Sequence, residues 1–150
     1  MTGQPPIPED ASLVALLRYA RETYAVRIRT RLGEAGYDDL PDNALYVVGG
    51  LARERGGRAL SQLIAELGVS KQAAGQLVDT LVIRGYLLRE VDPADRRRLT
   101  VTLTERGKAA AKIIGAARTA VDNALLTRVG AVNIERTRRT LAALAEIGRE

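Results

Sequence analysis

The sequence predicts a mainly helical fold that carries one small β-hairpin. Apolar residues recur at spacings of three and four through most of the 150 residues, which is the pattern of amphipathic helices. Only residues 86–88 and 99–103 form short, β-prone segments separated by polar residues. Hydrophobic residues make up 46% of the chain but include no Phe or Trp, so the core is expected to consist of Leu, Val, Ile and Ala, which suits helices packed on helices.

Two helices are expected in the first third of the chain. The first ends near Gly33, and its apolar face is formed by Leu13, Leu16, Leu17, Ala20, Tyr24, Ile28 and Leu32. Pro41 and Asp42 then provide a stop and a new N-cap, while Asp38 and Asp39 are expected to be turn residues. The second helix is expected to end near Gly56 and Gly57, and its apolar residues are Ala44, Leu45, Val47, Val48 and Leu51.

A helix-turn-helix is predicted in the middle of the chain. Residues 60–67 form a short amphipathic helix that Gly68 ends. Ser70 can cap a second helix, which continues until Gly85 supplies a left-handed C-terminal residue. Two helices joined by a tight, glycine-containing turn are typical of this motif.

A β-hairpin is expected directly after the second of these helices. Strands at Tyr86–Leu88 and Leu99–Leu103 are separated by the polar stretch REVDPADRRR. A hairpin at this place is a wing, so the predicted architecture is a winged helix-turn-helix. Asp92 and Asp95 could also be interpreted as a metal-binding carboxylate pair, but three adjacent arginines and no third ligand nearby favour salt bridging.

Two further helices complete the chain. Thr104 can cap a helix that runs to about Leu126 or Val129, and a last helix is expected from about Asn133 to Ile147. The first and last helices carry apolar faces that the small central module is not large enough to cover. We therefore expect them to pack together and against a second copy of the chain, in a homodimer.

The composition excludes several functional classes. The chain has no Cys and no His, which removes disulfides, thiol chemistry, the commonest metal ligand and the commonest general base. We expect no enzyme activity, no cofactor and no bound metal. There is no basic and apolar leader and no run of about 18 apolar residues, so a cytoplasmic, soluble protein without membrane contact is expected.

The charge favours a polyanionic partner. The formal net charge is +5, and the excess lies in the middle and the tail: residues 51–108 carry 11 basic and 7 acidic groups, and residues 109–150 carry 7 and 4. Residues 1–50, with 5 basic and 7 acidic groups, are slightly acidic. Charge alone leaves open an exposed basic surface that has no particular partner.

The segment from Leu60 to Lys108 resembles the MarR family of bacterial transcription regulators. It reads LSQLIAELGVSKQAAGQLVDTLVIRGYLLREVDPADRRRLTVTLTERGK. The specific part is DPADRRR at residues 92–98, followed by LTERG at residues 103–107. The resemblance implies a single domain over residues 1–150, in which about 42–104 form the winged core and about 10–36 and 105–150 form dimerisation helices.

The resemblance also implies a DNA-binding surface. The recognition helix is then Ser70–Arg84, with Ala74, Leu77, Val78 and Leu81 facing inward, and its candidate DNA-binding residues are Ser70, Lys71, Gln72, Ala73, Gly75 and Gln76. The wing adds Arg96, Arg97 and Arg98, with Arg97 expected in the minor groove and Asp95 expected to hold a wing guanidinium in a fixed direction. Gly75 and Gln76 depart from the commoner family pattern. Gly75 either permits close approach to DNA or is simply tolerated.

The function that these features predict is sequence-specific DNA-binding transcription regulation. The expected protein is a repressor that binds a palindromic operator as a homodimer and is released by a small lipophilic or aromatic effector. Arg21, Tyr24 and Tyr46 are candidates for the effector pocket, although the pattern favours amphipathic core residues for the two tyrosines. The alternatives are an effector-independent architectural or weakly specific DNA-binding protein and a winged-helix module that binds another protein.

Overall fold

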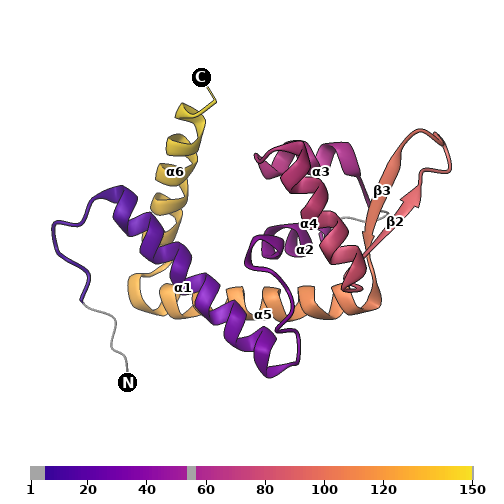
Figure 1. Cartoon of the computed structure of the whole chain (residues 1–150). Coiled ribbons are helices and arrows are strands. Elements are labelled where there is room, and N and C mark those ends of the chain that lie inside the picture. The colour runs from indigo at the N-terminus through magenta and orange to yellow at the C-terminus, as the bar shows by residue number, and fades with distance from the viewer. Residues whose placement is uncertain (1–5, 54–56, 150) are drawn as a thin grey trace.

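The computed structural model describes residues 6–53 and 57–149 and contains the predicted helices and hairpin (Figure 1). The elements are, in order, α1 (Leu13–Glu34), η1 (Asp42–Ala44), α2 (Leu45–Leu51), β1 (Arg58–Ala59), α3 (Leu60–Leu67), α4 (Lys71–Ile83), β2 (Leu87–Val91), β3 (Leu99–Leu103), α5 (Glu105–Val129) and α6 (Ala131–Ile147). The fold is thus mainly α with a small β wing. None of the helices in the described part of the chain is long and apolar enough to cross a membrane.

The long helix α5 connects two groups of elements (Figure 1). At one end of it lie α6 and the beginning of α1, and at the other end lie α2, α3, α4 and the wing. The C-terminal end of α4 and the base of the wing lie next to the start of α5, whereas the wing tip points away from α5. The arrangement separates a scaffold of long helices from a winged core.

Local signals in the sequence account for the helix boundaries. The hydroxyl oxygens of Ser70 and Thr104 accept hydrogen bonds from the backbone N–H groups of Ala73 and Gly107, which confirms both predicted N-caps. Gly85 has a φ of +80° after the end of α4, as predicted. The caps and the left-handed glycine depend on residues within four positions of one another, so sequence patterns can predict them.

The prediction for the second helix was wrong in two details. The cap position before η1 belongs to Pro41, and no side chain caps this helix. Asp42 is the first helical residue, and its carboxylate pairs with Arg29 of α1 at 3.0 Å. The helical segment ends at Leu51, before the expected end near Gly56 and Gly57, and Gly56 lies outside the described residues.

The sheet contains one strand more than expected. Its order is β1-β3-β2 with antiparallel pairing, and Arg58 and Ala59 pair with Val101 and Thr100. A two-residue strand has no periodicity from which it could be predicted. The strand expected at Tyr86–Leu88 begins one residue later and extends to Val91, which pairs with Leu99.

One hydrophobic core joins the winged core to the long helices. Its members from the winged core include Leu63, Val78, Leu81, Tyr86, Leu87 and Val101, and Ile28, Leu32, Ala110 and Ile114 come from α1 and α5. The four positions of the recognition helix that were expected to face inward, Ala74, Leu77, Val78 and Leu81, are all buried. By contrast, no residue of α6 is buried, although all of α6 is described.

Candidate nucleic-acid interface

The N-terminal half of α4 presents a polar surface that is exposed to solvent. Lys71, Gln72, Ala73 and Gln76 are exposed, and the cap residue Ser70 is exposed beside them. The opposite face of the helix is buried in the core, so the exposed face has a fixed direction. Side chains in such a position can reach base edges and phosphates when a helix enters the major groove.

Gly75 lies half-buried on the same helix, and protein packing does not require a glycine there. A Cβ atom added at this position would meet no atom within 4 Å. Gly75 also has no positive φ that a side chain would strain. Contacts within the described chain therefore do not explain a glycine at this position.

Two aspartates hold the wing tip in shape. The carboxylate of Asp92 accepts a hydrogen bond from the backbone N–H of Ala94 at 2.8 Å, and that of Asp95 accepts one from the N–H of Arg97 at 3.0 Å. Backbone bonds from Asp92 N–H to the carbonyl of Arg98 and from Arg98 N–H to the carbonyl of Asp95, both 2.9 Å, close the turn. Asp side chains commonly accept such hydrogen bonds from the backbone N–H two residues further on in turns.

The role of Asp95 differs from the predicted one. The prediction was that its carboxylate holds a guanidinium, but it binds the backbone N–H of Arg97 instead. Within residues 6–53 and 57–149, the exposed Arg96, Arg97 and Arg98 have no ion-pair partner. Because the nearby carboxylates are occupied by backbone groups, the three positive charges remain available to a ligand.

An ion pair that the sequence pattern did not indicate connects the wing to the recognition helix. Arg89 of β2 pairs with Asp79 of α4, and the Nε atom of Arg89 is buried without a hydrogen-bond partner. Arg89 lies in register with Val101 on the neighbouring strand. The pair ties the middle of the hairpin to the recognition helix. The only sequence signal was an acidic residue on α4 and a basic one ten residues later.

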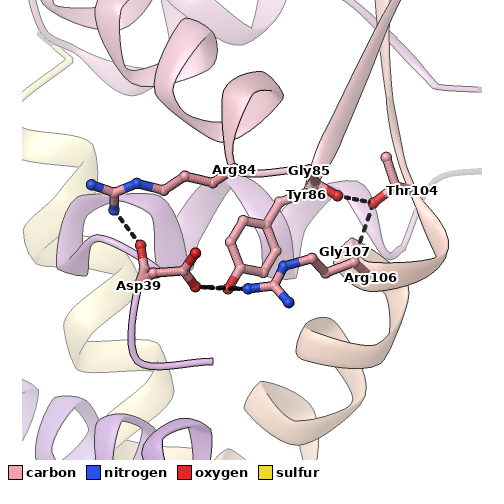
Figure 2. Close-up of polar contacts among 7 residues, drawn as sticks. All are labelled: Asp39, Arg84, Gly85, Tyr86, Thr104, Arg106 and Gly107. Atoms are coloured by element: carbon pink, nitrogen blue, oxygen red, sulfur yellow. Dashed lines mark hydrogen bonds and ion pairs between the residues drawn. The ribbon is translucent and has the colours of Figure 1, made fainter. Parts of the chain in front are cut away.

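Behind the wing, a second polar cluster joins the loop after α1, the junction between α4 and β2, and the first turn of α5 (Figure 2). Asp39, in the loop between α1 and η1, accepts hydrogen bonds from the hydroxyl of Tyr86 and, at 2.9 Å, from the guanidinium of Arg106. Its backbone carbonyl accepts a bond from Arg84. Arg106 also donates to the Tyr86 hydroxyl at 3.1 Å and lies over the rings of Tyr37 and Tyr86. We call these five residues the junction cluster.

The LTERG segment has a structural role in the same place. Thr104 caps α5 and donates its own hydroxyl to the carbonyl of Gly85 (Figure 2). Its backbone N–H donates to the carbonyl of Tyr86 at 3.1 Å. Gly107 lies so close to the Tyr86 carbonyl that an added Cβ would clash with it. The threonine and glycine therefore let the first turn of α5 approach the base of the wing.

The junction cluster shifts the pKa values of Asp39 and Tyr86 in opposite directions. The hydrogen bond from Tyr86, together with the charge of Arg106, lowers the pKa of Asp39 below its usual value. Burial and the bond to Asp39 raise the pKa of Tyr86 to about 12. A charged Asp39 and a neutral Tyr86 are therefore the stable forms over a wide pH range.

Comparison with known proteins identifies this architecture. The MarR family model matches residues 38–98, which include Asp39, both helices of the helix-turn-helix and the wing tip. Among solved structures, a crystal structure of MarR superposes with a TM-score of 0.73 at 24% identity, covering 96% of this chain and 95% of that one. Residues 38–98 thus match the MarR family, and the chain as a whole has the winged-helix fold of MarR. No curated protein sequence matches it significantly.

Two further MarR-like structures were solved with ligands. The S. aureus MepR–DNA complex has a TM-score of 0.76 at 16% identity, with 91% of this chain and 98% of that chain covered. The structure of NadR in complex with 4-hydroxyphenylacetate has a TM-score of 0.70 at 24% identity, with 96% and 99% covered. At these identities, the likeness shows that this chain has the fold of MarR-family transcription regulators.

The MarR fold of this chain contains a cavity of about 400 Å³ between α2, β1, α3 and α5. It is lined by Tyr46, Val47, Gly50, Leu51, Arg53, Arg58, Leu63 and Arg118. Tyr46 thus lies in this cavity, but the other two candidates for an effector pocket do not. Tyr24 donates its hydroxyl to Asp122 and connects α1 to α5, and Arg21 is exposed on α1. Arg118, at the cavity wall, was not predicted.

Proposed function

We propose that this protein is a sequence-specific DNA-binding transcription regulator that represses a promoter by occupying a palindromic operator. The observation that carries the proposal is the set of three exposed wing arginines whose neighbouring carboxylates are bound to the backbone. Such arginines suit a narrow, electronegative minor groove. The exposed residues of α4 supply the major-groove contacts, and the candidate set remains Ser70, Lys71, Gln72, Ala73, Gly75, Gln76, Arg96, Arg97 and Arg98.

The proposed active form is a homodimer. Large apolar side chains are exposed on α1, α6 and the C-terminal part of α5, among them Leu13, Val14, Leu126, Val132, Leu144 and Ile147. An exposed apolar surface of this kind favours a protein partner. In a dimer built on these helices, two recognition helices would read half-sites about one DNA turn apart. A regulator of this kind acts in the cytoplasm.

The test is the selection of binding sites from randomised duplex DNA at near-physiological salt. We expect a palindrome with two half-sites for the wild-type chain. Arg97→Ala should weaken binding to the selected DNA, whereas Arg27→Ala, which removes the same charge from α1, should not. Selection of no motif, combined with steep salt dependence, would instead support an architectural factor, and the absence of DNA affinity at low salt would support a protein-binding module.

A second proposal is that a small anionic aromatic molecule releases the protein from DNA. The cavity beside Tyr46 combines apolar walls with Arg118, whose guanidinium packs on Gly49 and has no ion pair within the described ranges 6–53 and 57–149. An apolar cavity with a few charged groups is the usual form of a small-molecule site. NadR was crystallised with 4-hydroxyphenylacetate, a molecule of this chemistry.

Calorimetric titration with 4-hydroxyphenylacetate tests the effector proposal. We expect binding to the wild-type chain and to Arg21→Ala, and a loss of binding in Arg118→Ala, because Arg21 lies outside the cavity. Equal binding to the Arg118 variant would contradict the assignment of the site. Added compound should also weaken binding to the selected DNA.

A further inference from the structure

Asp39 is bonded to the two residues on either side of Gly85, where the recognition helix α4 passes into strand β2 of the wing. Its backbone carbonyl binds Arg84, the residue that follows α4, and its carboxylate binds Tyr86, just before β2 (Figure 2). The same carboxylate binds Arg106 in the first turn of α5. One residue of the loop after α1 therefore contacts the reading elements and the helical scaffold at once.

The other groups of the junction cluster depend on this carboxylate. The side chain of Tyr86 is fully buried, so its hydroxyl needs an acceptor close by. The guanidinium of Arg106 lies over two tyrosine rings, and Asp39 is its ion-pair partner. Without Asp39, two donors on two different elements would lose the acceptor that they share.

We propose that Asp39 is a positioning residue that sets the angle between the winged core and α5, and thereby the spacing at which two recognition helices meet DNA. The proposal rests on the proposed function as a dimeric DNA-binding regulator. Asp39 does not contact DNA in this role. It acts through Arg84 and Tyr86 on one side and Arg106 on the other.

The geometry makes the reading elements sensitive to this angle. The cluster lies at the C-terminal end of α4, and the DNA-reading residues begin at its other end, about 20 Å away for a helix of this length. A rotation of about 5° at the cluster would move that end by about 2 Å, more than half the step of about 3.4 Å between base pairs. A small loosening at Asp39 would thus change which half-site spacing the dimer prefers.

The first experiment measures the angle without DNA. The chain has no native Cys, so Ala94→Cys at the wing tip and Thr119→Cys on α5 introduce a unique pair of sites for fluorescent dyes. Labelled chain is diluted into an excess of unlabelled chain, so that energy transfer reports distances within one chain. We expect Asp39→Ala to shift the mean distance or to broaden its distribution, and Asp39→Asn, which keeps one acceptor oxygen, to do so less.

Controls separate positioning from general damage. Glu34→Gln removes an acidic partner of Arg31 at the end of α1, near the same loop, and should leave the distance distribution unchanged. Tyr86→Phe keeps the buried ring and removes only the hydroxyl, so it tests the same link if Asp39→Ala does not fold. A folded Asp39→Ala and a folded Tyr86→Phe with the wild-type distribution would overturn the proposal.

The second experiment uses the DNA selected by the wild-type chain. We expect Asp39→Ala to bind the full palindrome about tenfold more weakly, and a single half-site within about twofold of wild type, because only the second, intramolecular contact depends on spacing. Inserting one base pair between the half-sites should cost the variant less than it costs the wild type. An equal loss on half-site and full site would overturn the positioning role. If the wild type selects no palindrome, the proposed function fails, and the distance measurement still decides whether Asp39 sets the angle.

Discussion

The tip of the wing and the junction cluster at its base use Asp and Arg in opposite ways. At the tip, Asp92 and Asp95 accept hydrogen bonds from backbone N–H groups, and the neighbouring arginines remain exposed without ion pairs in the described ranges 6–53 and 57–149. At the base, Asp39 binds the side chains of Tyr86 and Arg106. The arginine charges therefore have no carboxylate partner among the described residues at the tip of the hairpin, whereas at its base the charge of Arg106 is paired with Asp39.

Structural and functional arginines in this chain differ in what the nearest carboxylate binds. A carboxylate that binds side chains fixes the relative position of the elements that carry them. A carboxylate that binds its own turn fixes only the turn, and leaves positive charge for phosphates and grooves. Substitutions at the base should thus change stability and geometry, and substitutions at the tip should change DNA affinity alone.

The largest effect on stability is expected from Gly107→Ala. The new Cβ would clash with the carbonyl of Tyr86, so the first turn of α5 would have to move away from the wing. We expect a loss of about 2 to 3 kcal/mol in the free energy of unfolding, measured by urea denaturation. Gly115→Ala on the exposed side of the same helix meets no atom within 4 Å and should not destabilise the protein. A Gly107→Ala protein as stable as wild type would contradict the close contact.

Arg97→Ala should weaken DNA binding and leave the stability of the fold nearly unchanged. We expect at least about tenfold weaker binding to the selected DNA, which corresponds to about 1.4 kcal/mol, because a guanidinium that no carboxylate neutralises is lost from the wing tip. The free energy of unfolding should change by less than about 0.5 kcal/mol, and the dimer should remain intact. Fluorescence anisotropy measures the affinity, urea denaturation the stability and sedimentation the dimer. Unchanged affinity would disprove the assignment of the wing.

Alkaline pH should weaken the base of the wing. The folded protein holds the pKa of Tyr86 at about 12, above the usual value of 10.0, so this tyrosine stabilises the fold fully below about pH 10 and loses that contribution as the pH rises through 12. Tyr86→Phe should therefore flatten the fall in the urea midpoint between about pH 9.5 and about pH 11.5. Tyr46→Phe, in which an exposed tyrosine is replaced, is the control. Identical pH profiles for wild type and Tyr86→Phe would argue against the cluster.

Gly75→Ala should distinguish the two possible roles of this glycine in the recognition helix. Because the added methyl meets no protein atom, we expect the helix to become more stable by up to about 1 kcal/mol. A simultaneous loss of DNA affinity would indicate close backbone approach to DNA, whereas unchanged affinity would indicate that the glycine is merely tolerated. A destabilised variant would contradict the open space around this position.

The smallest change in overall affinity is expected from Gln76→Ala. Gln can pair with adenine through two hydrogen bonds, so its loss should relax the base preference at one half-site position while total affinity falls by about twofold. Repeating the site selection with the variant measures the preference at each position. An unaltered profile would count against a role of Gln76 in base readout.

The features that could be predicted from the sequence are those that depend on local interactions. Ser70 and Thr104 cap their helices by accepting hydrogen bonds from backbone N–H groups three residues further along the chain. Gly85 takes a left-handed conformation after α4, and the inward face of the recognition helix follows from helical spacing. Each depends on residues that are neighbours in the chain, so periodicity and capping rules suffice. The DPADRRR and LTERG segments also indicate the wing and the family, because each is a short run of adjacent residues.

The contacts between groups that are distant in the sequence could not be predicted from it. The sequence around Asp39 predicts a turn residue, yet its partners are 47 and 67 positions away, and the Asp79–Arg89 pair and strand β1 left no periodic signal. The carboxylate of Asp95 binds a backbone N–H rather than a guanidinium because the turn brings that N–H to 3.0 Å. Long-range partners follow from how helices and strands pack, and no spacing rule in the sequence records that packing.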